Sequence, residues 1–349
     1  WATILFIAGM MLMVEGMERA GFFRWLCLTI AKAVHYKTIP IFISFMLMSA
    51  FLAMFIDSIT VILFLAAVTV ELAHLLHFDP IPMIISEIFC SNLGGSATMC
   101  GDPPNIIIGT SLGYSFKDFI LNTGVATVFV IIVGLICMYF IYGRKLFVTD
   151  ESIAKVMQLD ENKAIKDRKL MHESVIVIIL VALCFIFHDQ LGVQSCTVAI
   201  AAACIMLLIG GQEPEEIIAD VEWPTILFFI GLFIVVGGMK KVGVITMLAN
   251  GLISITHGNM VVTMMVILWV SAIVSSFLDN IPFVATLIPM ILTMQSEGMD
   301  VAPIWWALSL GACLGGNGTL IGASANVVLS GISKNNGHPI TFGQYFKIG

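Results

Sequence analysis

The sequence is poor in charged residues. Only 11% of its 349 residues are charged, whereas 59% are hydrophobic and the mean hydropathy is +1.03. Soluble domains are usually about a quarter charged, so this shortage excludes a soluble globular protein. The 16 Lys and Arg residues form no basic patch of the kind that binds nucleic acid, and no nucleic-acid partner is expected.

Motifs of enzymes and metal sites are also missing. The eight cysteines lie almost all inside apolar segments and include no CxxC pair, which is typical of small core residues rather than disulfides or a metal site. There is no HExxH sequence, and the GxGD sequence of intramembrane aspartyl proteases is broken because Met99 stands at its first glycine. We therefore expect neither an enzyme nor a cofactor, and an intramembrane protease is a distant alternative.

Long apolar runs, by contrast, are abundant. Residues 118–142 carry a single charge, at Asp118, and about 20 such residues cross a hydrocarbon core. Several runs of this kind predict an all-α, polytopic membrane protein that sits in a lipid bilayer. The sequence opens inside an apolar run and stops at FGQYFKIG, where a further helix would be expected, so we expect both ends to be truncated.

The chain contains two copies of one unit. With an offset of 222, ten of the first 21 positions are identical to those of the segment that begins at Trp223, against roughly two expected by chance. The same offset places Phe55, Asp57 and Ile59 on Phe277, Asp279 and Ile281. With one residue dropped, an offset of 221 places Gly94, Gly95, Thr98, Gly101 and Asn105 on Gly315, Gly316, Thr319, Gly322 and Asn326. The duplication therefore preserves polar positions.

Each copy combines the same kinds of segment. We expect the first repeat (1–142) to contain a helix (1–17), an amphipathic stretch (20–36), an apolar hairpin around a polar tip (38–76), a Gly/Pro-broken helix (83–112) and a long helix (118–142). A polar linker (143–173) and two scaffold helices (174–210) follow. The second repeat (223–349) is expected to hold a hairpin at about 260–297 and a broken helix at about 303–332, with its final helix missing.

The number of membrane crossings between the copies decides their relative orientation. If 38–76 dips in and returns on one side while 20–36 lies in the interface, the number is odd and the second repeat is inverted. If 20–36 crossed instead, the repeats would be parallel, but the basic residues crowded into that short segment favour the interface. The inverted arrangement places thirteen of the sixteen Lys and Arg residues on one side. The linker 143–173 is therefore expected to be cytoplasmic, in a protein of the inner membrane.

Two carboxylates stand in the middle of apolar stretches. Asp57 in AMFIDSITVILF and Asp279 in SSFLDNIPFVAT would each cost roughly 2.5 to 3.5 kcal/mol at the centre of a bilayer. The functional hypothesis is that each tips a re-entrant hairpin and holds a cation or accepts a proton, with neutral oxygens from Ser58, Thr60 and Asn280. The structural alternative is that each caps the following half-helix, and both can hold at once.

A glycine-rich break is the second polar element of each repeat. SNLGGSATMCGDPPN (91–105) and GGNGTLIGASAN (315–326) interrupt apolar sequence, and non-helical backbone at membrane depth is tolerated only where it lines a cavity or is buried in protein. Half-helix amino termini favour an anion, whereas unwound carbonyls and neutral side-chain oxygens suit a hard cation such as sodium. Glycines also permit close helix packing, but two related copies that end in Asn105 and Asn326 favour a binding site.

These motifs resemble those of the ion transporter superfamily, and within it the arsenite and sodium/proton antiporter permeases of the ArsB/NhaD group. The resemblance rests on FIDSIT, FLDNIPFVATLIP, SNLGGSATMCGDPPNIIIG and GGNGTLIGASANVV, and it covers essentially the whole chain. It is greatest with P-protein type permeases, which are similar to citrate transporters (CitMHS-like). One departure is Ser58, where relatives generally carry Asn, as the second repeat does at Asn280.

The resemblance implies a secondary active transporter whose hairpins and broken helices meet at one site and move against a scaffold in an elevator-like cycle. A homodimer would suit that cycle. We expect the cargo to be an anion such as arsenite or an organic carboxylate, coupled to sodium or protons, with sodium/proton antiport as the alternative. Sodium is expected at Asp57, Asn105, Asp279 and Asn326. The full set of candidate binding residues is Asp57, Ser58, Thr60, Gly94, Gly95, Thr98, Asn105, Asp279, Asn280, Gly315, Gly316, Asn317, Thr319 and Asn326.

Overall fold

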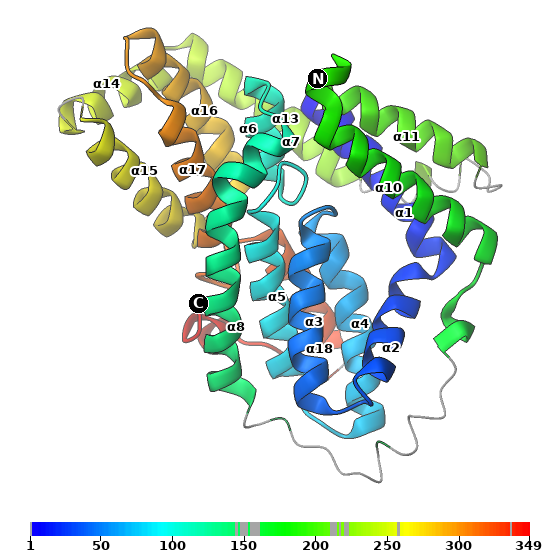
Figure 1. Cartoon of the computed structure of the whole chain (residues 1–349). Helices are drawn as coiled ribbons and strands as arrows, with labels where there is room; N and C mark the ends of the chain where they lie inside the picture. The colour runs from blue at the N-terminus through cyan, green and yellow to red at the C-terminus, as the bar shows by residue number, and fades with distance from the viewer. Residues whose placement is uncertain are drawn as a thin grey trace.

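The computed structural model confirms the all-α class, because the part of the chain that it describes contains helices and no strand (Figure 1). That part comprises residues 2–143, 161–209, 223–256, 259–335 and 337–349, with the single residues 146, 153, 215, 218 and 219. Within the segment expected to be the central linker (143–173), residues 144–145, 147–152 and 154–160 lie outside the described residues.

The helices of the first repeat follow its apolar runs. They are α1 (Ala2–Ala20), α2 (Phe22–Ala33), α3 (Thr38–Ala53), α4 (Ser58–Leu76), α5 (Ile81–Gly95), α6 (Pro103–Leu112), α7 (Phe116–Phe119), a π-helical turn η1 (Ile120–Gly124) and α8 (Val125–Tyr142). The chain leaves helical geometry at 54–57 and again at 96–102. These two breaks coincide with the polar tip and the glycine-rich motif.

The same order returns in the second half of the chain. A short turn, η3 (Glu161–Ala164), precedes α10 (Arg168–Leu191) and α11 (Ser195–Ile209). The second repeat then forms α13 (Trp223–Lys241), α14 (Val244–Thr256), α15 (Met260–Ser275), α16 (Asn280–Ser296), α17 (Ala302–Gly315), α18 (Ser324–Asn335) and α19 (Phe342–Phe346). Its two breaks, at 276–279 and 316–323, again fall on the polar tip and the glycine-rich motif.

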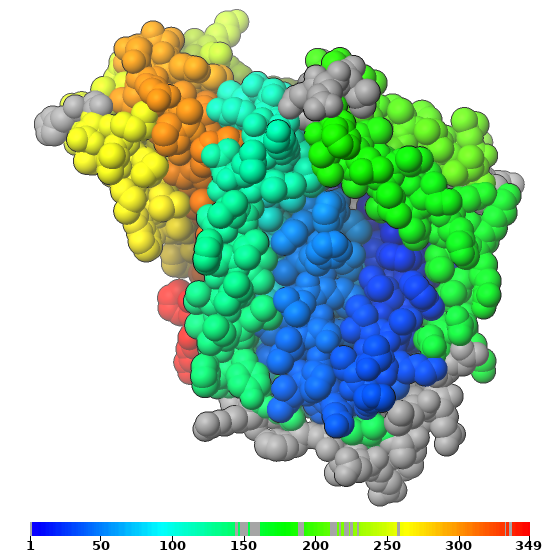
Figure 2. Space-filling model, viewed as in Figure 1, coloured from blue at the N-terminus to red at the C-terminus, as the bar shows by residue number. Residues whose placement is uncertain are grey.

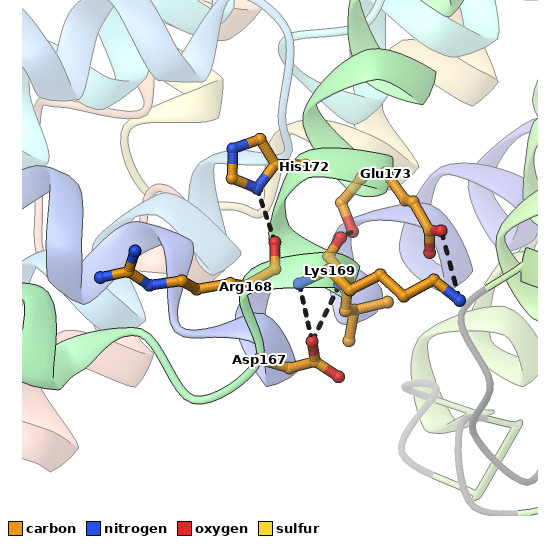
Figure 3. A network of polar contacts seen from close by, with 7 residues as sticks. Asp167, Arg168, Lys169, His172 and Glu173 are labelled. Atoms are coloured by element: carbon orange, nitrogen blue, oxygen red, sulfur yellow. Dashed lines mark hydrogen bonds and ion pairs between the residues drawn. The ribbon is translucent and has the colours of Figure 1, made fainter.

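Helix α10 begins inside the range expected for the polar linker. Asp167 accepts hydrogen bonds from the amides of Lys169 (2.9 Å) and Leu170 (3.0 Å), which caps the helix ahead of its apolar run (Figure 3). One turn on, the ammonium of Lys169 lies 3.7 Å from the carboxylate of Glu173. The first turn of α10 is therefore polar and is held by local interactions, and the apolar part of the helix follows it.

Several helices suit a bilayer. Three in the described part are long and apolar enough to cross one, namely Ser58–Leu76, Phe116–Tyr142 and Arg168–Phe187. A fourth is added if Ile226–Lys241 and Val244–Thr256, which meet at a bend of 70°, form one broken span. Helix α8 lies on the surface beside α3, as Figure 2 shows. Its exposed side chains include a long row of apolar ones, and lipid would cover such a row. These features support a polytopic membrane protein.

The two repeats are interleaved. Within each repeat the first hairpin helix packs on the first arm of the broken helix, as α3 does on α5 and α15 on α17. Between repeats the second arm packs on the second hairpin helix of the other copy, as α6 does on α16 and α18 on α4. Helix α18 also contacts α5, and Figure 1 accordingly shows it behind α4 and α5, although it is far from them in sequence. The four breaks therefore meet at the centre of the molecule.

Candidate functional site

Each hairpin tip is closed by its aspartate. The Asp57 carboxylate accepts hydrogen bonds from the amides of Ile59 (3.0 Å) and Thr60 (3.3 Å), and Asp279 accepts one from the amide of Ile281 (3.1 Å). The backbone angles of the two aspartates agree within a few degrees, with φ −50° and ψ 136° at Asp57 and φ −51° and ψ 132° at Asp279. The capping alternative is thus confirmed for both, and the amides hold each carboxylate beside a helix amino terminus, where negative charge is stabilised.

A threonine joins each glycine-rich loop to the hairpin tip of its own repeat. The Thr98 hydroxyl donates to the carbonyl of Met54, and the Thr319 hydroxyl donates to the carbonyl of Ser276. Each hydroxyl also accepts a bond of 3.3 Å from the amide two residues later in its loop. The two loops are therefore held against the two tips by the same hydrogen bonds.

The two asparagines predicted to bind sodium fold the loops. Asn105 donates from Nδ2 to the carbonyls of Gly95 (3.2 Å) and Thr98 (3.0 Å). Asn326 does the same with the carbonyls of Gly316 (2.8 Å) and Thr319 (3.0 Å). Both asparagines are fully buried, and their amide hydrogens bridge the start and the middle of each break. Their amides act on the protein backbone, which gives them a positioning role.

Two of the predicted glycines allow the broken helix to touch the hairpin. A Cβ at Gly94 would overlap the carbonyl oxygen of Ala50, and a Cβ at Gly315 would overlap that of Ala272. At Gly95 and Gly316 a Cβ would make tight contacts of 3.0 and 3.2 Å with the end of the same loop. The approach of two backbones at Gly94 and Gly315 requires glycine, so these two positions shape the site.

The asparagine oxygens reach across to the other repeat. The Asn326 Oδ1 accepts from Nδ2 of Asn92 (3.0 Å), and the Asn105 Oδ1 accepts from the Cys313 thiol (3.6 Å) and the Ser309 hydroxyl (2.6 Å). Asn92 and Cys313 occupy equivalent positions in the two repeats. Each asparagine therefore ties its own loop to the first arm of the other broken helix.

A further asparagine closes this network. Asn317 accepts from Nδ2 of Asn92 (2.9 Å) and donates to the carbonyl of Phe89 (3.3 Å). One side chain, Asn92, thus donates to two residues of the second glycine-rich loop. These bonds make the central part of both repeats one hydrogen-bonded body.

The first repeat carries a carboxylate that the second lacks. Asp102 is buried at the start of α6, and it accepts from Nδ2 of Asn280 (3.1 Å) and, more weakly, from the Ser58 hydroxyl (3.4 Å). Ser58 and Asn280 are equivalent residues of the two tips, whereas the residue equivalent to Asp102 is Ala323. Asp102 therefore lies between the tips and contacts both.

The second repeat has a hydroxyl instead. Ser324 donates to the Asp279 carboxylate over 2.6 Å, and its equivalent in the first repeat is Pro103, which has no such group. We use the term first half-site for Asp57, Ser58 and Asp102, and second half-site for Asp279, Asn280 and Ser324. The first holds two carboxylates and the second holds one.

A cavity of about 380 Å³ lies between these tips and two helices of the opposite wall. Asp57, Thr60, Asp279 and Ser324 supply its polar side, and Cys100 lies beside them. Its apolar side comes from α1, through Ile7, Met10, Met11 and Val14, and from α13, through Phe228. The described residues that line it include no Lys or Arg, and the printed hydrogen bonds to the two carboxylates come from backbone amides and from Ser324.

The predicted site residues therefore fall into three places. Asp57, Thr60 and Asp279 line the cavity, and Ser58 and Asn280 meet at Asp102. The others hold the loops and tips without lining the cavity, and they are Gly94, Gly95, Thr98, Asn105, Gly315, Gly316, Asn317, Thr319 and Asn326.

The sequence analysis missed Asp102, Ser324, Asn92 and Ser309. The sequence did contain an indication for Asp102. The next two residues, Pro103 and Pro104, have no amide hydrogen, so the Asp102 side chain cannot cap its helix by bonding to them and is available for other contacts. Ser324 could have been found as a hydroxyl next to the second-repeat equivalent of that position. Asn92 and Ser309 bond across the repeat interface, and no spacing in the sequence reports such a contact.

Comparison with known proteins agrees with the resemblance seen in the motifs. Residues 1–311 match the model of the CitMHS family, described as citrate transporter. An uncharacterized transporter of Mycobacterium tuberculosis is 38% identical over the whole chain, which covers 82% of that relative. A 46 kDa membrane protein of Mycobacterium leprae is 36% identical with the same coverage, and the human P protein is 28% identical over 99% of the chain and 51% of its own length. The chain therefore belongs to the CitMHS family of transporters within the ion transporter superfamily.

Proposed function

We propose that the protein is a cation-coupled secondary transporter that moves a small anion, either an organic carboxylate or arsenite, with sodium or protons as the driving ion. The observation that carries the proposal is the cavity into which both repeats direct an aspartate, at equivalent helix starts, from hairpin tips that are otherwise neutral. The description of the matching family, citrate transporter, supports an organic carboxylate as cargo.

The charge of the cavity makes the coupling obligatory in this proposal. A unit charge about 4 Å from a carboxylate interacts with it by about 4 kcal/mol in a partly solvated protein site. An anion that entered beside Asp57 and Asp279 would be repelled by both carboxylates, which line the same cavity. Cations must therefore bind with the cargo. Anion movement without cations would be unfavourable for the same reason.

The packing supports an elevator-like cycle. The tips and loops of both repeats are joined by buried hydrogen bonds, including those of Asn92 and Asn105, and so would move together. The wall opposite them, from α1 and α13, meets the cavity with apolar side chains such as Met10 and Met11. One hydrogen bond, between the hydroxyls of Thr3 in α1 and Thr110 in α6 (2.6 Å), would have to break as the two parts move. We propose that this wall, with α10 and α11 behind α1, is part of the scaffold. A homodimer in the inner membrane, with a cytoplasmic linker, completes the proposal.

Sodium/proton antiport is the second candidate. The observation that favours it is again the lining, whose described residues offer carboxylates to cations and no basic group to an anion. In this case sodium and protons would occupy Asp57 and Asp279 in turn, and no cargo would be needed.

The test is transport by the full-length protein in proteoliposomes. We would apply a sodium or a proton gradient, add citrate or arsenite, and record the membrane current, internal pH and cargo uptake for the wild type, Asp57→Asn and Asp279→Asn. The proposal expects current and uptake only when an anion is added, with loss of both in each variant. Sodium-driven proton movement in the absence of any anion would establish the antiporter instead.

A further inference from the structure

The first repeat buries a glutamate that takes no part in the two half-sites. Glu87 lies in the middle of α5 and is completely buried. Its Oε1 accepts from the Thr69 hydroxyl of α4 over 2.6 Å, whereas its Oε2 has no hydrogen-bond partner in the described part of the chain. One turn further along α5, the buried hydroxyl of Ser91 is likewise without a partner among the described residues. Two unpartnered oxygens therefore lie on one face of α5.

The second repeat shows that packing does not require these polar groups. The residues equivalent to Thr69, Glu87 and Ser91 are Ile291, Leu308 and Ala312, and all three are completely buried. Helices α16 and α17 pack on each other as α4 and α5 do, so an apolar core fills the same place there. A buried carboxyl group with an unpartnered oxygen costs free energy that a leucine does not. Such a cost inside an apolar helix indicates a function.

The helices around α5 bring no basic group to Glu87. They are α3, α4, α8, α17 and α18. Helix α3 has no titratable side chain, and those of the other four are Glu71, His74, Cys137, Tyr139, Tyr142, Cys313 and Lys334. None of them is among the groups that act on Glu87 in the part of the chain that the structure describes. An ionised carboxylate is costly in such a place, and binding of a proton removes its charge.

Helix α2 lies near the same carboxyl group and does not neutralise it either. The thiols that Glu87 affects are those of Cys27 in α2 and of its own neighbour Cys90. The cationic side chains of α2 are directed elsewhere, since Arg24 pairs with Glu71 (2.7 Å) and Lys32 with Glu161 (2.5 Å). The described surroundings of Glu87 are therefore neutral.

The ligand that fits this place is a proton. Hard metal ions such as calcium and magnesium take about six or more oxygen ligands, whereas the described side chains on this face add only the Thr69 and Ser91 hydroxyls to the carboxyl group. Glu87 is also not among the described residues that line the cavity between the tips. A proton needs one oxygen, and Oε2 is available for it. When the proton leaves, the negative charge stays on the carboxylate, with Thr69 still donating to Oε1.

We infer that Glu87 is a proton-binding site of the transport cycle, separate from the aspartates of the tips, and that a proton is one of the driving ions. This inference rests on the proposed function and narrows it. Glu87 is connected to both tips, because Thr69 belongs to the helix that begins after Asp57, and Asn92, which bonds to the second loop, follows Glu87 in α5 by about 7.5 Å.

The position of α2 provides a way for the proton to enter and leave. Helix α2 follows α1 of the proposed scaffold after a single residue, Gly21, and it also packs on α3 and α4 of the first hairpin. A shift of the hairpin relative to α1 would therefore move α2 past the Glu87 side chain. Water could then reach Oε2 in one state of the cycle and not in the other, which is what coupling requires.

The experiment compares the full-length wild type with Glu87→Gln and with Glu87→Leu, which copies the second repeat. Infrared spectra in lipid from about pH 5 to 9 should show a carboxylic-acid band in the wild type that is lost as pH rises and is missing in both variants. In proteoliposomes with equal sodium and fixed external pH, an inward gradient of one pH unit should raise the accumulation of radioactive citrate or arsenite by up to about tenfold per coupled proton. Both variants should lose one such factor while still exchanging internal for external cargo.

The control variant is Glu71→Gln, which makes the same change at an ion pair whose side chains are partly exposed, and it should behave as the wild type in both measurements. A Glu87 band that stays constant over the whole pH range would overturn the inference, because the glutamate would then be a permanently neutral core residue. Wild-type accumulation under the proton gradient in Glu87→Gln would overturn it as well. If the proposed function itself fails, the wild type moves neither cargo under any gradient, and the infrared titration still decides whether Glu87 binds and releases a proton.

Discussion

The two half-sites share a frame and differ in charge. Hydrogen bonds from Thr98 and Thr319 to the tips, and from Asn105 and Asn326 within the loops, are the same in both repeats. The groups that complete each half-site are unlike, with Asp102 in the first and Ser324 in the second. The duplicated residues therefore set the geometry, and the residues that differ between the copies give the two half-sites different charge and different hydrogen-bonding groups.

The largest effect is expected at two glycines, Gly94 and Gly315, where an added side chain would overlap the backbone of a neighbouring helix. Gly94→Val and Gly315→Val would each drive a side chain into the carbonyl oxygen of Ala50 or Ala272. Overpacking of this kind costs about 1–3 kcal/mol or more, so we expect both proteins to lose the folded, monodisperse state in size-exclusion chromatography. Gly231→Ala, at a helical glycine with open space around it, is the matched control. A stable Gly315→Val protein would show that the frame is not shared.

Next in size is the loss of the tip carboxylates. Asp57→Asn and Asp279→Asn keep a capping oxygen, so we expect both proteins to fold. Each loses a charge next to the bound cation, which should weaken sodium binding by about 100-fold or more. Isothermal titration in detergent checks this. An affinity that is unchanged in either variant would contradict a role for that tip.

The hydroxyl of the second half-site should matter less. Ser324→Ala removes the hydrogen bond to Asp279, which is worth about 0.5–1.5 kcal/mol or a factor of about 2 to 12 in affinity. Pro103→Ser makes the first half-site resemble the second at this position and restores an amide at the start of α6. We expect sodium titrations to show weaker binding for the first variant. For the second, we expect tighter binding, because the new hydroxyl can donate to Asp57 as that of Ser324 donates to Asp279. Equal titrations for all three proteins would mean that Ser324 plays no part in ion binding.

Loss of the link between the repeats is expected to affect stability more than ion affinity. Asn92→Ala leaves the buried oxygens of Asn317 and Asn326 without their donor, at a cost of about 1–3 kcal/mol. Cys313→Ala, the equivalent change in the second repeat, removes a weaker thiol bond and should cost less. Thermal unfolding followed by intrinsic fluorescence gives the order. A larger loss for Cys313→Ala than for Asn92→Ala would contradict it.

The smallest effect is expected at the surface. Arg24 and Glu71 form an ion pair of 2.7 Å, but their side chains are 56% and 38% exposed. Exposed pairs contribute about 0–1 kcal/mol, so Arg24→Gln should unfold at nearly the wild-type temperature and transport normally. A marked loss of transport would show that this part of α2 and α4 belongs to the moving machinery.

Much of the frame could be predicted from the sequence. The repeat offset identified the two tips and two loops, since a carboxylate or a glycine cluster inside an apolar run has few structural explanations. The helix breaks at 54–57 and 96–102 fall where those residues predicted them. Asp57 and Asp279 also follow the capping alternative, because an aspartate before a helix accepts from its free amides.

The contacts between repeats could not be predicted in the same way. Asn92 and Ser309 lie within helices, and only the packing of α5 and α17 against the opposite loops makes them donors. Asp102 could not be found from the repeat either. Comparison of the two copies selects residues that match, and this position is Asp in one copy and Ala in the other. The orientation of the repeats in the membrane and the side on which the linker lies stay predictions.

The most direct test of the central claim, that both tips serve one site, is a double-mutant cycle of cation-dependent citrate uptake by the wild type, Asp57→Asn, Asp279→Asn and the double variant in proteoliposomes. Groups that act as a unit are strongly non-additive, so we predict that either single replacement reduces the uptake rate nearly as much as both together. A double variant whose loss equals the product of the two single losses, each of them partial, would contradict the account and would mean two independent sites.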